Sequence, residues 1–171
     1  VRPNRRELGA KEVKIAISAG THKSKAVDGK RWKEMVTHPE VAKRITTKFT
    51  DRAALVAPHM LATKDDYHFR IFADDQQVGR IGMYEPTAGR TTYFVGFFID
   101  FDYWGRGICT EALRQLVRFA FEDVGIHKLH GDNDSDNPAS GRVMEKAGFE
   151  KVAVFKEHHY IAGKYVDVIH W

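Results

Sequence analysis

Tyr103-Trp104-Gly105-Arg106-Gly107-Ile108-Cys109-Thr110-Glu111 is the segment from which the architecture of this chain can be inferred. It follows an apolar run, residues 93–99, that is typical of a buried strand, and it leads into an apolar repeat that is typical of a helix. Two glycines and an arginine therefore lie at a strand-to-helix turn. Such a turn offers free backbone N–H groups, a positive helix end and a guanidinium to one anion. We interpret it as a cradle for a pyrophosphate; glycines that serve only tight backbone geometry would give the same pattern.

The spacing of these glycines excludes two familiar phosphate-binding motifs. No Gly-X-X-X-X-Gly-Lys-Ser/Thr string occurs, and Thr110 stands where a dinucleotide fingerprint needs its third glycine. The turn instead resembles the acyl-CoA loop of the GNAT superfamily of N-acetyltransferases, in which Arg/Gln-X-X-Gly-X-Gly/Ala follows a strand. Residues 104–113 are similar to the RimJ/RimL-like branch, where Trp-Gly-Lys/Arg-Gly-Ile/Tyr-Ala-Thr-Glu-Ala-Leu recurs. Trp104 replaces the Arg/Gln, and Cys109 replaces a small residue.

Two further strings support the resemblance. Asp136-Asn137-Pro138-Ala139-Ser140 and Glu145-Lys146-Ala147-Gly148-Phe149 resemble the family's Asn-Pro-Ala-Ser and Glu-Lys-Leu-Gly-Phe, in the same order and at the family's spacing. The likeness covers residues 93–171. It implies one acetyltransferase domain over residues 1–171, with an acyl-CoA-binding core at about residues 92–150. The implied fold is α/β (α+β), a mixed and mostly antiparallel central sheet with splayed strands, flanked by helices.

The same resemblance implies an N-acetyltransferase that moves the acetyl group of acetyl-CoA directly to a primary amine. The RimJ/RimL-like branch indicates a protein or peptide N-terminus as the acceptor. Small-molecule amines, including polyamines and antibiotics, are acceptors on the same fold and stay open. A non-catalytic, CoA-binding regulatory domain is a second class of function. A nucleic-acid module built on the basic N-terminal third is another.

The resemblance also assigns residues to acetyl-CoA. Backbone groups near the end of strand 91–99 hold the pantetheine arm, because in the family this strand bulges and splays from the next; we place the bulge at Gly96. Residues 105–110 bind the pyrophosphate through their amides. Asn137, which could also cap its helix, contacts the pantetheine. The residues assigned to acetyl-CoA are Phe97, Phe98, Ile99, Trp104, Gly105, Arg106, Gly107, Ile108, Cys109, Thr110 and Asn137.

Acetyl transfer needs a proton donor for the departing thiolate and a base for the amine. Many family members use a Tyr seven residues after the helix-capping Asn, but Met144 stands there and cannot donate. Ser140 matches the donor of RimJ/RimL-like enzymes, and ordinary polarity at a helix N-terminus would explain it as well. Glu111 matches the family's Thr-Glu-Ala-Leu, and we assign it as the general base. A purely structural role, in which its charge stabilises the positive end of the helix dipole, would explain it as well. The other bases that stay open are Glu85, Asp100, Glu157, His158 and His159.

The pKa of the acceptor amine bears on the strength of base that is needed. An α-amine has a pKa near ~8, so roughly a tenth of it is neutral at pH 7. A lysine or polyamine amine near ~10.4 has about one part in a thousand or less in that form. A site without an obvious strong base therefore favours an α-amine, or an amine whose pKa has been lowered.

Cys109 is the one cysteine, so the chain forms no internal disulfide. We interpret it as a small-residue substitute that faces phosphate and not as a nucleophile, because the family transfers acyl groups directly. Its position near a helix N-terminus predicts a lowered thiol pKa. The neighbours His158 and His159 lack a third and fourth ligand at workable spacing, so we expect no metal.

Composition places the chain among globular proteins, because 43% of its residues are hydrophobic and 29% are charged. No apolar run reaches the ~18–20 residues of a membrane span, and no apolar region follows the charged N-terminus as in a secretory signal. We therefore expect no membrane association and a cytoplasmic location. Residues 1–50 hold thirteen Lys/Arg and five Asp/Glu, but no aromatic residue accompanies them before Trp32, which argues against nucleic-acid binding. The sequence does not fix the oligomeric state, and a homodimer is one state that we consider.

Local patterns predict the remaining elements. Strands are expected over residues 11–17, 67–72, 78–83, 91–99, 128–132, 151–155 and 165–170. Helices are expected over residues 28–36, 39–49, 52–61 and 107–123, and from Pro138 to a Schellman cap at Gly148. The strands between residues 67 and 99 form an antiparallel meander, and the helix after Gly107 makes a right-handed crossover to a parallel strand.

Overall fold

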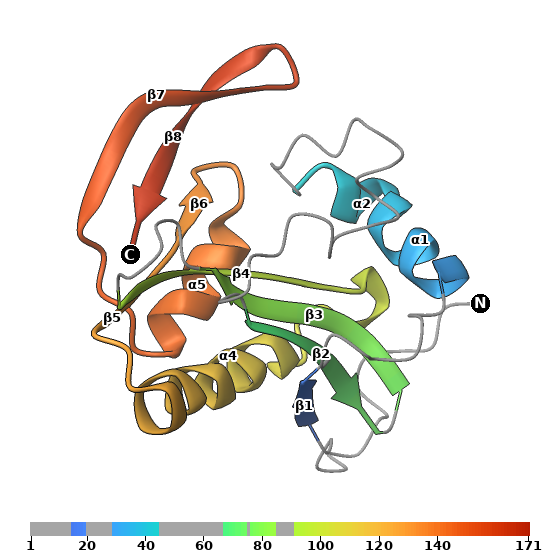
Figure 1. Ribbon diagram of the computed structural model, residues 1–171. Helices are drawn as coiled ribbons and strands as arrows, with labels where there is room; N and C mark the ends of the chain where they lie inside the picture. The colour runs from blue at the N-terminus through green and yellow to red at the C-terminus, as the bar shows by residue number, and fades with distance from the viewer. Residues whose placement is uncertain (1–14, 20–28, 45–66, 75, 85–90) are drawn as a thin grey trace.

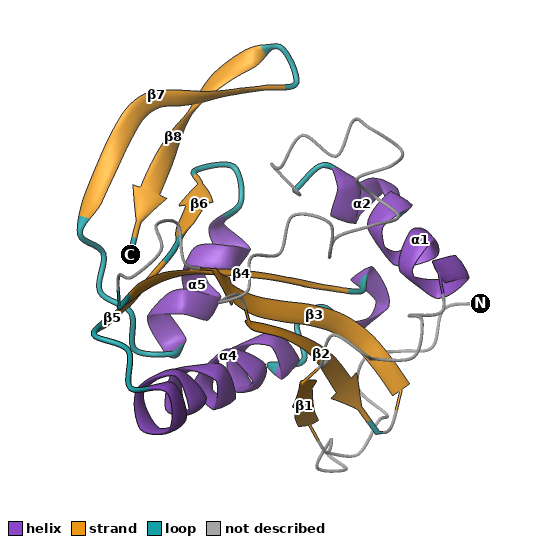
Figure 2. Ribbon diagram, in the orientation of Figure 1, coloured by secondary structure: helices purple, strands orange, loops and turns teal. Residues whose placement is uncertain are grey.

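The computed structural model describes residues 15–19, 29–44, 67–74, 76–84 and 91–171 (Figure 1). These residues form two sheets and the helices that accompany them (Figure 2). The strands are β1 (Ile15–Ala19), β2 (Tyr67–Ala73), β3 (Gln76–Tyr84), β4 (Thr92–Ile99), β5 (Lys128–His130), β6 (Asp132–Asp134), β7 (Ala153–Ile161) and β8 (Lys164–His170). The helices are α1 (Gly29–Thr37), α2 (Pro39–Ala42), α4 (Ile108–Arg118) and α5 (Pro138–Lys146), with short helical segments η1 (Phe101–Tyr103) and η2 (Phe119–Val124). None of the helices in these ranges is long and apolar enough to cross a membrane.

The first sheet has the strand order β1-β2-β3-β4-β5. Its first four strands are antiparallel neighbours, and β5 pairs in parallel with β4 after the crossover through α4. The predicted meander is therefore confirmed, and so is the parallel pairing of the strand that follows the crossover helix. The first strand is described from Ile15 onward, so residues 11–14 of its predicted span lie outside the described residues. The helix predicted over residues 52–61 and residues 45–49 of the helix before it lie outside them too.

The bulge predicted at Gly96 is wrong. β4 pairs with β3 without a shift in register, and Gly96 lies opposite Gly82. The irregularity lies between β2 and β3, where Val78 is an extra residue between two paired positions. A Cβ at Gly96 would lie 3.3 Å from the ring of Tyr84, so the glycine gives that ring room.

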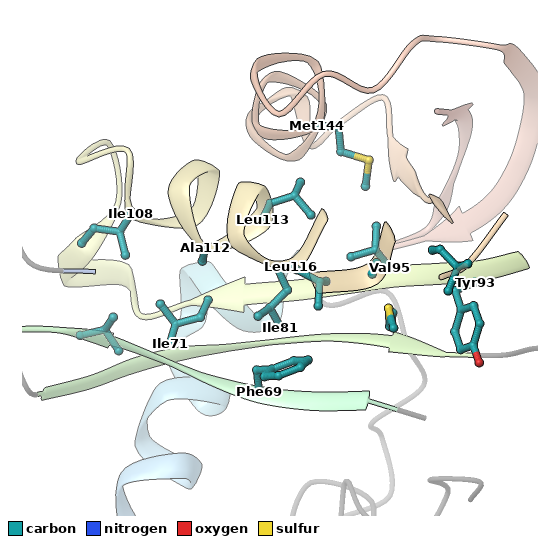
Figure 3. Close-up of a cluster of buried hydrophobic side chains, with 14 of the residues drawn as sticks. Phe69, Ile71, Ile81, Tyr93, Val95, Ile108, Ala112, Leu113, Leu116 and Met144 are labelled. Atoms are coloured by element: carbon teal, nitrogen blue, oxygen red, sulfur yellow. The ribbon is translucent and has the colours of Figure 1, made fainter. Parts of the chain in front are cut away.

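The hydrophobic core lies between α4 and the first sheet. Ala112, Leu113 and Leu116 of α4 are fully buried and lie over Ile81 and Val95 of the sheet (Figure 3). Burying one leucine side chain stabilises a fold by about 1.5–3 kcal/mol, so this apolar face strongly fixes the position of α4. The turn that precedes α4 is thereby held at the end of β4.

The strands β4 and β5 pair over three residues and then separate. Thr92, Tyr93 and Phe94 pair with Lys128–His130. After Gly131 the chain continues as β6, which belongs to the second sheet, of order β6-β8-β7. Residues 95–99 of β4 therefore have β3 on one side and no paired strand among the described residues on the other. This is the splayed arrangement that the sequence predicted.

The second sheet contains a long hairpin that reaches away from the first sheet (Figure 1). β7 extends to Ile161, past its predicted end at residue 155, and turns at Ala162 and Gly163 as expected. Before this hairpin, α5 ends in the predicted Schellman cap. The Phe149 N–H donates to the Met144 carbonyl at 3.1 Å, and Gly148 has a φ of 94°.

Candidate functional site

The turn at residues 105–107 has backbone angles that favour glycine. Gly105 has a φ of 74° and Gly107 a φ of 77°, and nothing lies within 4 Å of a Cβ built on either. Conformation, and not crowding, therefore requires glycine at both positions. Gly107 is the N-cap of α4 and no side chain makes a cap hydrogen bond to it. The first N–H groups of α4 have no partner within the helix, which makes this turn a site for an anion.

Two side chains brace this turn. The Arg106 Nη2 donates to the Asp102 carbonyl at 2.9 Å, and the guanidinium lies 5.0 Å from the centre of the Tyr103 ring. The Trp104 Nε1 donates to the Ile99 carbonyl at 2.9 Å, which ties the turn to the end of β4. Trp104 thus replaces the family's Arg/Gln with a fixed structural contact, while exposed Arg106 keeps positive charge at the turn.

The backbone of β4 is directed alternately to its two sides. The Asp100 N–H donates to the Val78 carbonyl at 2.7 Å, so the backbone of Asp100 is directed toward β3. Alternation in an antiparallel pair then directs Phe98 toward β3 as well, and Phe97 and Ile99 toward the gap where β5 has ended. Of the three strand residues assigned to acetyl-CoA, Phe97 and the Ile99 N–H therefore face the side where β5 has ended, whereas Phe98 does not; the Ile99 carbonyl on that side accepts from Trp104.

Asn137 and Ser140 meet at the start of α5. The Asn137 Nδ2 donates to the Ser140 Oγ at 2.9 Å. Asn137 occupies the predicted N-cap position, with Pro138 after it, but its side chain makes no cap hydrogen bond. Its side-chain nitrogen instead donates to Ser140, and its side-chain oxygen accepts from Arg44. The side chain of Asn137 therefore positions the hydroxyl that the sequence assigned to the departing thiolate.

Arg44 is a site residue that the sequence analysis missed. It follows α2, its Nη1 donates to the Asn137 Oδ1 at 3.4 Å, and its guanidinium lies 5.1 Å from the centre of the Trp104 ring. One cationic side chain thus links the turn after β4 to the start of α5. In the sequence Arg44 is one of thirteen basic residues before residue 51, and nothing in the local pattern distinguishes it.

Met144 stands where many family members have a tyrosine. It is 2% exposed and points from α5 toward Val95 in the core (Figure 3). A Cβ added at Gly131 would lie 2.7 Å from the Met144 Cε. Met144 is therefore a packing residue, and Gly131 gives it room at the point where β4 and β6 separate.

The prediction that the Cys109 thiol has a lowered pKa is wrong. Burial raises its pKa to about 12, whereas its place near a helix N-terminus led us to expect a lowered value. The residue keeps part of its surface, but desolvation of the thiolate outweighs the attraction of the helix end. Cys109 is thus protonated at neutral pH, which agrees with its interpretation as a small packing residue.

Glu111 contacts residues of its own helix. Its Oε1 accepts from the Gln115 Nε2 at 3.3 Å, and its Oε2 lies 3.9 Å from the Arg114 Nη1. No hydrogen bond joins Glu111 to Ser140 or Asn137 in the described part of the chain. These side-chain contacts of Glu111 are thus within α4, whereas Ser140 and Asn137 contact each other.

The other acids and histidines considered as bases differ in their surroundings. Asp100 is 5% exposed and its Oδ1 accepts from the Asp102 N–H at 3.4 Å, a capping contact at η1. Glu85 lies outside the described residues. Glu157 and His158 are exposed on β7. His159 is the exception, because its Nδ1 lies 2.7 Å from the Oδ1 of the buried Asp134.

The described residues contain no group of three or more His, Cys, Asp or Glu side chains that could hold a metal ion. The polar groups that they bring together after β4 and at the start of α5 are backbone amides, a hydroxyl, an amide side chain and a guanidinium. Such groups suit a phosphate and an amide-containing chain.

Comparison with known proteins supports the same reading of the chain. The family model described as Acetyltransferase (GNAT) domain matches residues 6–150. Probable N-acetyltransferase YjcK of Bacillus subtilis (strain 168) is 36% identical over 110 residues, which make up 63% of this chain and 61% of that protein. Ribosomal-protein-serine acetyltransferase of Escherichia coli (strain K12) is 26% identical over 100 residues, 58% of this chain and 56% of that protein. The chain thus matches about three fifths of the length of these relatives.

A solved structure with the same fold contains the coenzyme. Spermidine N-acetyltransferase from Vibrio cholerae, in complex with CoA and spermine, has a TM-score of 0.71 against this chain at 14% identity. The match covers 92% of this chain and 94% of the other. At this identity the likeness shows the fold alone, and it confirms the predicted α/β fold class with its mixed sheet.

Proposed function

This chain belongs to the GNAT acetyltransferase family, and from that premise we propose that it transfers the acetyl group of acetyl-CoA directly to the N-terminal α-amine of a protein or peptide. The observation that carries the proposal is the gap between β4 and β6. The turn at residues 105–107 follows the end of β4, and Asn137 and Ser140 follow the end of β6. Arg44 links these two groups, because it lies over the Trp104 ring and bonds to the Asn137 Oδ1. Family membership alone would support many chemistries, so the proposal rests on this site.

The residues at the gap fit acetyl-CoA. The N–H groups that open α4 would hold the pyrophosphate, and Arg106 would add charge there. The backbone groups of Phe97 and the Ile99 N–H would bind the pantetheine amides as an added strand does. Acetyl-CoA supplies the thioester. The Ser140 hydroxyl, fixed by Asn137, would then donate a hydrogen bond to the departing sulfur.

The proposal of an α-amine acceptor has two supports. The sequence relative named for a ribosomal protein is 26% identical, whereas the spermidine enzyme is similar in fold at 14% identity. A primary α-amine is also about a hundredfold more often neutral at pH 7 than a polyamine amine. A polyamine acceptor is the alternative, and the structural likeness to the spermidine enzyme favours it.

The test is an acceptor panel with acetyl-CoA. It would contain peptides with free N-termini, the same peptides with a blocked N-terminus and an internal lysine, and spermidine. Thiol release with free N-termini, and mass spectra that place the acetyl group on the first residue, are expected. Turnover with spermidine and none with the peptides would contradict the acceptor class. Tight CoA binding without turnover on any amine would indicate a non-catalytic domain.

A further inference from the structure

We propose that His159, held by Asp134, is the base that takes the proton from the acceptor amine, an inference that rests on the proposed acetyl transfer. The contact that carries it joins two strands that are not neighbours. Asp134 is the last residue of β6 and His159 lies on β7, with β8 between them. The Nδ1 of His159 lies 2.7 Å from the Oδ1 of Asp134.

The strand register explains how the two side chains meet. Asp134 pairs with Val168, and His159 pairs with Val166, two residues away on the same strand. Because side chains two residues apart share a face, Asp134 and His159 lie on one face of the second sheet. Val166 and Val168 are 5% and 0% exposed, so His159 reaches Asp134 across an apolar surface.

β7 carries a bulge that sets this register. Three residues of β7, Lys156, Glu157 and His158, oppose the single residue Asp167 of β8. The Asp167 carboxylate accepts from the Lys156 Nζ at 2.7 Å and from the Glu157 N–H at 3.0 Å. The bulge is thus closed by specific bonds, and it brings His159 opposite Val166, a position that Glu157 would occupy without the two extra residues. Bulges of this kind often direct a side chain into a site.

The Nδ1 of His159 contacts Asp134, and its Nε2 has no hydrogen-bond partner among the described residues. The Asp134 side chain is 9% exposed and the His159 side chain is 38% exposed. A carboxylate accepts hydrogen bonds only, so neutral His159 carries its proton on Nδ1. Its Nε2 then has a free lone pair, the form of the ring that can accept a proton.

Several other charged groups face this pair. Asp132 and His170 lie on the same face as Asp134, because they pair with each other at the start of β6. Burial raises the pKa of Asp132, while His170 and His159 oppose the rise. His158 lies beside His159 on β7, with 5.3 Å between ring centres. Two carboxylates on this face would favour the approach of a cationic amine.

Asp134 and His159 are also connected to Ser140, beside which the thiolate would leave. The Asp134 carbonyl accepts from the Asn137 N–H at 2.8 Å, and Asn137 holds Ser140. Asn133, whose side chain points to the other face of β6, would lie 3.0 Å from a Cβ at Gly141 of α5. The face of His159 is therefore the one away from α5. The amine would approach from the side of His159, and the thiolate would leave on the side of Ser140.

In the proposed acetyl transfer, every proton and every broken bond is accounted for. The ammonium of the acceptor gives one proton to the Nε2 of His159, and the neutral nitrogen attacks the thioester carbonyl carbon. A C–N bond forms and the C–S bond breaks. The second proton leaves the new amide nitrogen, and the thiolate takes up a proton as CoA is released. No oxidant, reductant or metal is consumed.

The test uses the full chain with the peptide that it acetylates best. For His159→Asn we expect kcat/KM to fall by about a hundredfold or more near pH 7, because a general base contributes about that much. The loss of kcat/KM relative to the wild type should become smaller as pH rises, because the amine then loses its proton to water. His158→Asn is the matched control, a histidine on the adjacent position, and should keep wild-type kcat/KM. CoA affinity and the thermal midpoint, measured for each variant, report whether it has folded.

A second readout needs no activity. Nitrogen-15 NMR of the wild-type imidazoles should show neutral His159 with its proton on Nδ1, and Asp134→Asn should shift that proton to Nε2. Asp134 is a positioning residue, so this variant should also lose activity while it still binds CoA. A wild-type proton on Nε2, or a His159→Asn deficit that does not change with pH, would overturn the proposal. An inactive wild type with the expected tautomer would refute acetyl transfer and, with it, the role of the base.

Discussion

At Cys109 two effects on one thiol oppose each other. The N-terminus of α4 attracts a thiolate, whereas burial disfavours it, and burial raises the pKa to about 12. The raised value means that the thiol stays protonated from neutral pH up to about that value. The thiolate fraction near pH 8 is then about a thousandfold lower than that of a free cysteine.

Alkylation by iodoacetamide measures this fraction directly. We expect the native protein to react about a thousandfold more slowly than the same protein in denaturant, with a rate that still rises above about pH 9. CoA should slow the reaction further, because Cys109 lies in the first turn of α4, whose N–H groups would hold the pyrophosphate. A native rate that levels off near about pH 9, as for a free thiol, would contradict the role of burial.

Ser140 tests the donor end of the site. Its Oγ accepts from the Asn137 Nδ2, which leaves its own proton free to be donated to the sulfur. For Ser140→Ala we expect kcat to fall by about tenfold to a hundredfold with little change in CoA affinity, because the hydroxyl acts on the departing thiolate. Ser135→Ala, an exposed serine before α5, serves as the control. Unchanged turnover in Ser140→Ala would remove this hydroxyl from the mechanism.

At the scale of the element, the start of α4 depends on the backbone of Gly107. Its φ of 77° costs a residue with a side chain about 1–2 kcal/mol. Gly163 is the control, because it has a φ of 84° in the β7–β8 turn and its replacement has the same backbone cost at a position distant in sequence from α4. We therefore expect Gly107→Ala and Gly163→Ala to lose similar free energy of unfolding in urea, and only Gly107→Ala to weaken CoA binding. Equal CoA affinity in the two variants would exclude the α4 N-terminus as the phosphate site.

Among the helices, strands and caps, the sequence predicts those that depend on residues close together in the chain. The β2–β3 hairpin, the strand β4, the helix after Gly107 and the Schellman cap at Gly148 each follow from residues close together in the chain. Gly96 shows where such reasoning stops. A glycine inside a strand suggested a bulge, but the structure shows regular pairing there and a close approach to the ring of Tyr84, which comes from the neighbouring strand.

At the scale of the whole molecule, the parts of the site that the sequence could not predict are the long-range contacts. Arg44 and Asn137 are 93 residues apart, and Asp134 and His159 are 25 apart. The second pair also depends on the order β6-β8-β7 and on a bulge in β7. The motif strings could indicate Ser140 and the glycine turn, because these lie within single segments. Which base faces them is decided by how the two sheets come together.

The gap between β4 and β6 is the feature on which this account depends. It exists because β5 leaves β4 after His130 and the chain enters the second sheet. A crystal structure of the protein grown with CoA tests it most directly. The account predicts pyrophosphate oxygens within hydrogen-bond distance of the amides of residues 105–110 and a pantetheine chain along Phe97 and Ile99. CoA bound elsewhere, or β4 and β6 paired along residues 95–99, would contradict it.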